Sequence, residues 1–124
     1  MQVPILKQGG YLIASIQAAL SDADLLQLRD NVAERVGQFR SRGVIIDVTV
    51  LDVIDSFATR TLRAIAHMLQ LRGAETVIVG IQPDVAYAMV RLGMGTGAVS
   101  TALDLEEGLA HLARTGHGPG RTAT

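Results

Sequence analysis

Apolar positions along the chain alternate between short continuous runs and helical spacings, beginning with two runs near the N-terminus. Val3–Leu6 and Tyr11–Ile16 are separated by Lys7–Gly10, which ends in two glycines. Glycine tolerates the positive φ angles of tight turns, so this pattern predicts two antiparallel strands. We therefore expect the chain to begin with a β-hairpin.

A helical period follows the hairpin. Ser21 can cap a helix, with Asp24 near the third helical position. Apolar side chains then recur every three or four residues, which predicts a helix with one buried face. These positions are Leu25, Leu28, Val32, Val36 and Phe39. We expect the basic segment Arg40–Arg42, and then Gly43, to end this helix.

The rest of the chain alternates strand-like and helix-like segments. Val44–Val48 is a continuous apolar run apart from one aspartate, as expected of a strand covered on both faces. Ser56–Arg72 has helical spacing and is closed by Gly73. The later segments are a strand at Thr76–Gly80, a helix from Pro83, a weakly marked short strand at Ala98–Val99 and a helix from Asp104. This order predicts an α/β fold: a mixed, mostly parallel β-sheet with an N-terminal antiparallel hairpin, packed against about four α-helices.

Composition and charge narrow the class of protein. The 124 residues fit one domain, which we expect at 1–115, followed by a disordered polar tail at 116–124. A net charge of -1 is too small for a nucleic-acid or membrane binder driven by charge. The absence of cysteine excludes a disulfide framework and a thiolate metal site. Because we see no signal peptide and no apolar run of roughly 20 residues, we expect a cytoplasmic protein.

The most informative candidate site in the sequence lies in the segment 46–57. It leads out of a predicted buried strand into a predicted helix, and α/β folds place their sites at the carboxyl ends of parallel strands. Ser56 stands at the helix entry, preceded by Asp47, Asp52 and Asp55. One interpretation is structural: Ser56 caps the helix and the aspartates are loop residues. In the other interpretation Ser56 is a phosphoacceptor. A phosphate there would add about −1.5 to −2 charges and make the surface strongly acidic.

The sequence lacks the motifs of the other kinds of site that we considered. Ile54–Ala58 lacks both glycines of the Gly-x-Ser-x-Gly nucleophile elbow. The glycine-rich residues 93–97 lack the Lys-Ser/Thr of a phosphate-binding loop and do not follow a strand. The lone lysine, Lys7, lies too early for a receiver-type phosphoacceptor site, and the three histidines have no metal-ligand spacing. We therefore expect neither an enzyme nor a bound cofactor or metal.

Four motifs occur in a fixed order along the chain. They are Val3–Lys7 with Ser15–Gln17 after it, Ile54–Phe57, Gly80–Pro83 and Thr101–Leu109. Together they resemble RsbS-type stressosome proteins, a branch of the STAS domain family, over residues 3–115. The resemblance implies a STAS fold and a non-enzymatic scaffold within the stressosome, a large cytoplasmic signalling complex.

The resemblance also implies partners and a switch. RsbS-type proteins co-assemble with RsbR-type proteins, sequester an RsbT-type serine kinase and release it once it has phosphorylated them. An RsbX-type phosphatase resets the system. The phosphorylated serine of the family corresponds to Ser56, and we expect Asp52, Asp55, Phe57 and Thr59 on the switch surface that binds partners. Phe57 is equally compatible with a place in the core.

Alternatives within the family stay open. Anti-sigma-factor antagonists carry Asp-Ser-Ser/Thr-Gly-Leu-Gly at this helix start, whereas Phe57–Arg60 replaces the glycine pattern here. RsbR-type proteins usually have a threonine where Ser56 stands. Both differences favour the RsbS type over an anti-sigma-factor-antagonist-like switch. A further alternative is a STAS module that senses a small ligand, but the four scattered aromatic residues offer little for a ligand pocket. Another alternative is an interaction domain without a switch.

Overall fold

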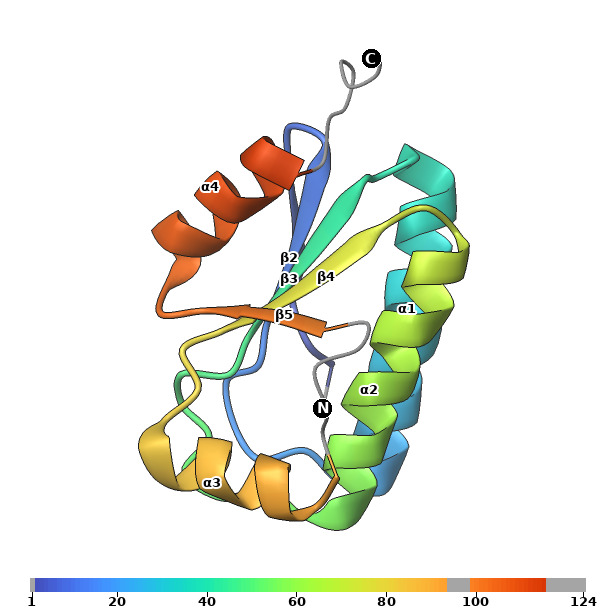
Figure 1. The fold of residues 1–124 in the computed structure, drawn as a ribbon. Helices are drawn as coiled ribbons and strands as arrows, with labels where there is room; N and C mark the ends of the chain where they lie inside the picture. The colour runs from blue at the N-terminus through green and yellow to red at the C-terminus, as the bar shows by residue number, and fades with distance from the viewer. Residues whose placement is uncertain (1, 94–98, 116–124) are drawn as a thin grey trace.

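The computed structural model describes residues 2–93 and 99–115, which form one mixed β-sheet covered by helices on both faces (Figure 1). The strands are β1 (Ile5–Gln8), β2 (Tyr11–Ser15), β3 (Gly43–Asp47), β4 (Glu75–Val79) and β5 (Val99–Ala102). They lie side by side in chain order; β1 and β2 are antiparallel and the other pairs are parallel. The predicted fold class is therefore confirmed.

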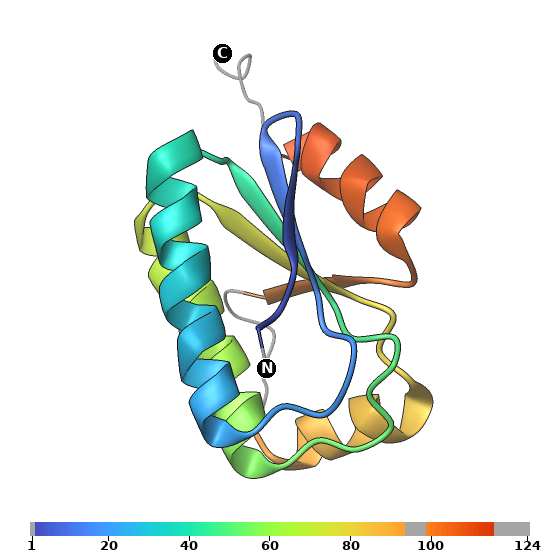
Figure 2. The same cartoon turned by 180° about the vertical axis from the view of Figure 1, so that it is seen from behind.

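Four helices connect or follow these strands. They are α1 (Asp22–Phe39), α2 (Ser56–Leu71), α3 (Pro83–Arg91) and α4 (Leu105–Thr115). Helices α1 and α2 lie side by side on one face of the sheet and α4 covers the other, as Figure 2 shows from behind. Helix α3 lies near the end of the sheet where the parallel strands finish. None of the helices in the described residues is long and apolar enough to cross a bilayer.

The inner strands alternate their side chains between two cores. In β3, Val44 and Ile46 belong to the larger core beneath α1 and α2, and Ile45 belongs to the smaller core beneath α4. All three are fully buried. A strand covered on both faces favours apolar residues at successive positions, which is why Val44–Ile46 of β3 and Val77–Val79 of β4 are continuous apolar runs in the sequence.

The ends of α1 show one correct prediction and one error. Ser21 and Asp24 form the predicted capping box, each side chain accepting the other residue's backbone N–H at 3.1 Å. Gly43 does not end this helix. Helix α1 stops at Phe39 because Arg40 adopts the left-handed conformation at φ 50°, and Gly43 is the first residue of β3.

The later part of the chain follows the prediction with small shifts in boundaries. The helix expected from Asp104 is present as α4, and Asp104 caps it, since its carboxylate accepts the Glu107 N–H at 2.9 Å. The weakly predicted final strand is present as β5 and extends to Ala102. Two predictions, the tail at 116–124 and most of the glycine-rich connection at 93–97, fall outside the described residues.

Candidate functional site

Ser56 lies on the loop side of the sheet, where the parallel strands end. The chain leaves β3 at Asp47, passes through a loop at 48–55 and enters α2 at Ser56. The ends of β2, β3 and β4 are neighbours at this edge, because Asp47 pairs with Ser15 on one side and Val79 on the other. Ser56 is exposed at the first position of α2. The structure thus places the candidate phosphoacceptor on an accessible edge of the fold.

The residue that caps α2 is Asp55 and not Ser56. Asp55 has extended backbone angles, and its Oδ1 accepts the Ala58 N–H at 2.8 Å. The structural interpretation of Ser56 as the helix cap is therefore wrong. The Ser56 hydroxyl has no hydrogen-bond partner among the described residues. A modification of this hydroxyl would leave the capping bond of α2 in place.

The loop that presents Ser56 is held at its start by three contacts. The Asp47 Oδ1 accepts bonds from the Thr49 N–H at 3.0 Å and the Thr49 hydroxyl at 2.6 Å. The Gln82 side-chain amide donates to the Thr49 carbonyl at 2.7 Å. Gly80 approaches so closely that an added Cβ would overlap the Thr49 hydroxyl and lie 3.1 Å from its Cα. Asp47 is therefore a loop-positioning residue, as the structural interpretation had it.

The structure divides the other predicted switch residues into three environments. Asp52 is exposed, as a partner-facing residue must be. Phe57 is half-buried in a shallow recess that Arg29 and Arg60 also line. Thr59 does not face partners: it is 1% exposed, and its hydroxyl donates to the Asp55 carbonyl at 2.9 Å. This expectation was wrong because Thr59 lies on the side of α2 that packs into the fold.

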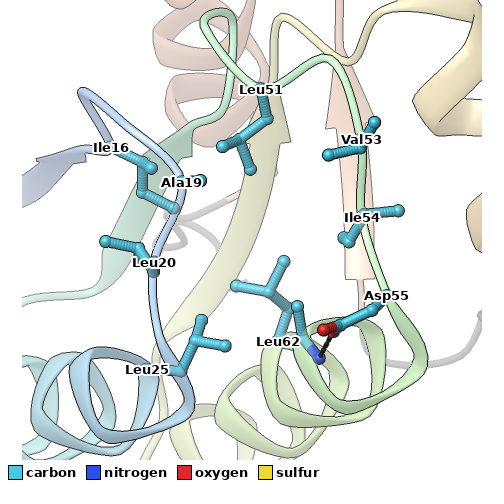
Figure 3. Close-up of a pocket in the computed structure, with 10 residues that line it drawn as sticks. Ile16, Ala19, Leu20, Leu25, Leu51, Val53, Ile54, Asp55 and Leu62 are labelled. Atoms are coloured by element: carbon cyan, nitrogen blue, oxygen red, sulfur yellow. Dashed lines mark hydrogen bonds between the residues drawn. The ribbon is translucent and has the colours of Figure 1, made fainter.

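An apolar hollow of about 210 Å³ lies directly beside the cap of α2 (Figure 3). Three segments line it: the connection from β2 to α1 with the first turns of α1, the loop at 48–55, and α2. Its lining residues are Ile16, Ala19, Leu20, Leu25, Leu51, Val53, Ile54, Asp55, Ala58 and Leu62. Sequence reasoning missed this hollow, because no spacing in the chain shows that the segments around Ala19 and Val53 meet.

A second polar cluster lies at the opposite end of β4. The Glu75 carboxylate accepts bonds from the Ser100 hydroxyl at 3.0 Å and the Thr115 hydroxyl at 2.6 Å, and it contacts the His111 Nε2 at 2.7 Å. Burial raises the pKa of Glu75, but the bonds from Thr115, His111 and Ser100 outweigh burial and leave the pKa below its ordinary value. The cluster ties the last turns of α4 to the sheet. Within the described residues, no group of three or more acidic or histidine side chains could hold a metal ion.

Comparison with known proteins identifies the family. A family model, the STAS domain, matches residues 2–107. The chain belongs to the STAS domain family. This match includes every strand, the loop at 48–55 and Ser56, so the candidate site lies within the shared domain.

Solved STAS structures include two that are similar in both fold and sequence. The RsbS protein of Moorella thermoacetica, in a variant with a serine replaced by glutamate, is 32% identical with a TM-score of 0.81. That match covers 90% of this chain and 95% of the other. A chain from a structure of the stressosome, described as a signal integration and transduction hub, is 33% identical with a TM-score of 0.80, covering 90% and 96%. The expected resemblance to RsbS-type STAS proteins is thereby confirmed.

Two further relatives are similar in fold alone or over only part of their length. The unphosphorylated anti-sigma factor antagonist SpoIIAA is 15% identical with a TM-score of 0.74, covering 90% of this chain and 96% of that one, which shows a shared fold alone. The RsbT co-antagonist protein RsbRA of Bacillus subtilis is 29% identical over 83 residues, 67% of this chain. The chain spans only 30% of the length of that relative.

Proposed function

We propose that this STAS domain is a non-enzymatic subunit of a stressosome-type assembly in the cytoplasm. In this proposal it co-assembles with RsbR-type STAS proteins and sequesters an RsbT-type serine kinase. Phosphorylation of Ser56 by that kinase releases it, and an RsbX-type phosphatase reverses the modification. The observation that carries the proposal is the exposed hydroxyl of Ser56, which stands beside the cap of α2 without serving as that cap.

The surroundings of Ser56 favour a change of surface charge over a change of fold. A phosphate at the first position of a helix gains about 0.3–1 kcal/mol from the helix dipole. Asp55 precedes it directly and Asp52 lies in the same loop, so their carboxylates oppose the added charge. Arg60 is exposed four residues further along α2, the spacing at which helical side chains are neighbours. These contributions offset one another, whereas about −1.5 to −2 charges appear on the partner-facing surface.

Release follows from the place where the charge appears. The described residues offer no metal cluster, and the kinase of this proposal supplies the nucleotide and its magnesium. To accept a phosphoryl group, Ser56 must approach the nucleotide phosphates of the kinase. After transfer, phosphoserine and the remaining diphosphate are two anions side by side, and the added bulk occupies the contact. Both effects weaken the complex.

Mass spectrometry with a cognate RsbT-type kinase, ATP and magnesium tests the proposal. Wild type should gain one phosphate that maps to Ser56, and Ser56→Ala should gain none. Thr101→Ala, which removes another exposed hydroxyl, serves as the matched control and should behave as wild type. In binding measurements, Ser56→Asp should hold the kinase more weakly than wild type. Absence of the phosphate with a demonstrably active kinase, or equal binding by Ser56→Asp, would contradict the proposal.

A further inference from the structure

We propose that the apolar hollow beside Ser56 is a docking site that receives one large hydrophobic side chain of the kinase, next to a basic residue of the same kinase. The hollow is defined by the ten lining residues given above. This inference rests on the proposed function and deepens it, because it separates the contact that provides affinity from the hydroxyl that accepts phosphate.

The size of the hollow fits a side chain better than a small-molecule ligand. Its volume of about 210 Å³ lies below the roughly 300–1,000 Å³ of ligand and cofactor sites. Protein interfaces commonly place one large apolar side chain in a pocket of this kind, and such anchors carry much of the binding free energy. Figure 3 shows Leu20, Leu51, Ile54 and Leu62 around the space that an anchor would fill.

The rim of the hollow leaves apolar surface in contact with water. Val53 is 72% exposed and Val50, in the same loop, is 54% exposed. Both lie within six residues of Ser56, on a loop whose start is fixed by the Asp47 and Gln82 contacts. Val53 thus extends the apolar lining of the hollow to the solvent, with Val50 exposed in the same loop, and a docked partner would cover this surface.

Charge identifies the chemistry of that partner. Asp55 is the one ionisable residue among the ten that line the hollow, Asp52 is exposed in the same loop, and no lysine or arginine lines the hollow. A complementary surface therefore combines an apolar anchor with a cation. A second copy of this chain, docking through the same face, would bring its own Asp52 and Asp55 into the interface, and the lining of its hollow would supply no cation to offset them.

A test compares steady-state phosphorylation of hollow variants with that of matched controls. Ala19→Phe fills the hollow from its exposed rim, and Val53→Ser removes apolar rim surface. Ala110→Phe on α4 makes the same change as Ala19→Phe at an exposed position away from the hollow, and Leu71→Ser at the far end of α2 likewise replaces an exposed aliphatic side chain with serine. We expect Ala19→Phe to raise the KM for this protein as the kinase substrate about 10- to 100-fold, and Val53→Ser by less, with kcat unchanged. The controls should match wild type.

A second pair of variants tests how charge contributes to docking of the kinase. Asp52→Lys should raise the KM by about threefold to tenfold at low salt, and the effect should shrink as ionic strength rises. Glu34→Lys makes the same change of charge at an exposed position in the C-terminal half of α1 and should leave the KM unchanged.

The possible outcomes separate this inference from the proposed function. If wild type is phosphorylated on Ser56 while Ala19→Phe and Val53→Ser keep the wild-type KM, the docking site is refuted and the switch stands. If Ala110→Phe raises the KM as much as Ala19→Phe does, the effect is not specific to the hollow and the inference fails. If Ala19→Phe changes self-association and not the KM, a second copy is the occupant. If wild type is neither bound nor phosphorylated, both proposals fail together.

Discussion

Stability measurements on two adjacent residues test the assignment of the α2 cap. Asp55 and Ser56 are both residue types that commonly cap helices, but only the Asp55 carboxylate accepts a backbone N–H of the first turn, that of Ala58 at 2.8 Å. We therefore expect Asp55→Ala to destabilise the protein and Ser56→Ala to leave its stability nearly unchanged. This contrast is informative because the two residues are adjacent in the chain and both are exposed.

The expected magnitudes follow from the contacts that each change removes. Asp55→Ala deletes the capping bond and a negative charge at the helix N-terminus, which together cost about 1 kcal/mol, within a range of roughly 0.5–2 kcal/mol. Ser56→Ala removes an exposed hydroxyl without a partner among the described residues. Alanine also has the higher helix propensity, so the free energy of unfolding should stay within about 0.5 kcal/mol of wild type.

Urea unfolding followed by circular dichroism measures both changes. With a slope of about 1–2 kcal/mol per molar urea, the loss in Asp55→Ala corresponds to a midpoint lowered by roughly 0.5–1 M. Asp55→Asn keeps an oxygen that can accept the Ala58 N–H and should recover most of the loss. Asp52→Ala, which removes an exposed carboxylate from the same loop, should unfold at nearly the wild-type midpoint.

One result would refute the reasoning. If Ser56→Ala lowers the midpoint as far as Asp55→Ala does, the serine hydroxyl caps α2 in solution. The separation of the cap from the proposed phosphoacceptor would then be lost, and phosphorylation would alter the capping group itself. If both variants match wild type, the first turn of α2 is held by its packing and the capping bond contributes little.

Two further predictions concern the contacts around β4. Because the pKa of Glu75 lies below its ordinary value, its ionised form adds stability that is present above about pH 4.5 and is lost as pH falls through the lower folded value. Glu75→Gln should therefore be less stable than wild type by under about 1 kcal/mol at pH 7, given partial solvent screening, and the difference should shrink towards pH 3 in urea unfolding. Gly80→Ala should cost more than about 1 kcal/mol, since Gly80 combines a φ of 77° with the close approach to Thr49. Gly73→Ala, with a φ of 86° and open space around the added Cβ, isolates the backbone contribution; equal losses in thermal unfolding would show that the Thr49 contact does not matter.

The elements that the sequence predicted are those whose signal is local. The hairpin followed from two glycines between apolar runs, and β3 and β4 followed from continuous apolar residues. The start of α1 followed from Ser21 and Asp24, which are three residues apart. In each case the physical cause lies within one turn or one strand, so the chain itself displays it.

The errors arose where neighbouring residues have similar local preferences. Asp55 and Ser56 are both good caps, and the choice depends on the residue at which the backbone changes from extended to helical. Arg40 and Gly43 could each end α1, and it is Arg40 that adopts the left-handed conformation after the helix. Thr59 was assigned to the surface because it lies close to Ser56 in the sequence, whereas its burial depends on which side of α2 meets the sheet.

The features that the sequence did not reveal combine distant segments. Glu75, Ser100, His111 and Thr115 meet only because β4, β5 and α4 are adjacent in space. The apolar hollow likewise needs the segment around Ala19 beside the loop around Val53. The sequence carries the residues of both features, but no periodicity connects them.

The placement of Ser56 next to the cap, and not at it, bears on how the proposed switch could be reversed. In a phosphoacceptor that also caps a helix, modification replaces the capping hydroxyl with a phosphate, so each cycle would change the stability of the fold. Here Asp55 keeps that bond, Asp47 and Gln82 hold the start of the loop, and the Ser56 hydroxyl is left without a structural task among the described residues. In the proposed function, a kinase and a phosphatase would then add and remove charge while these contacts stay in place. The energetic consequence of the proposed phosphorylation would then fall on the complex with the partner, which is where a switch of this kind must act.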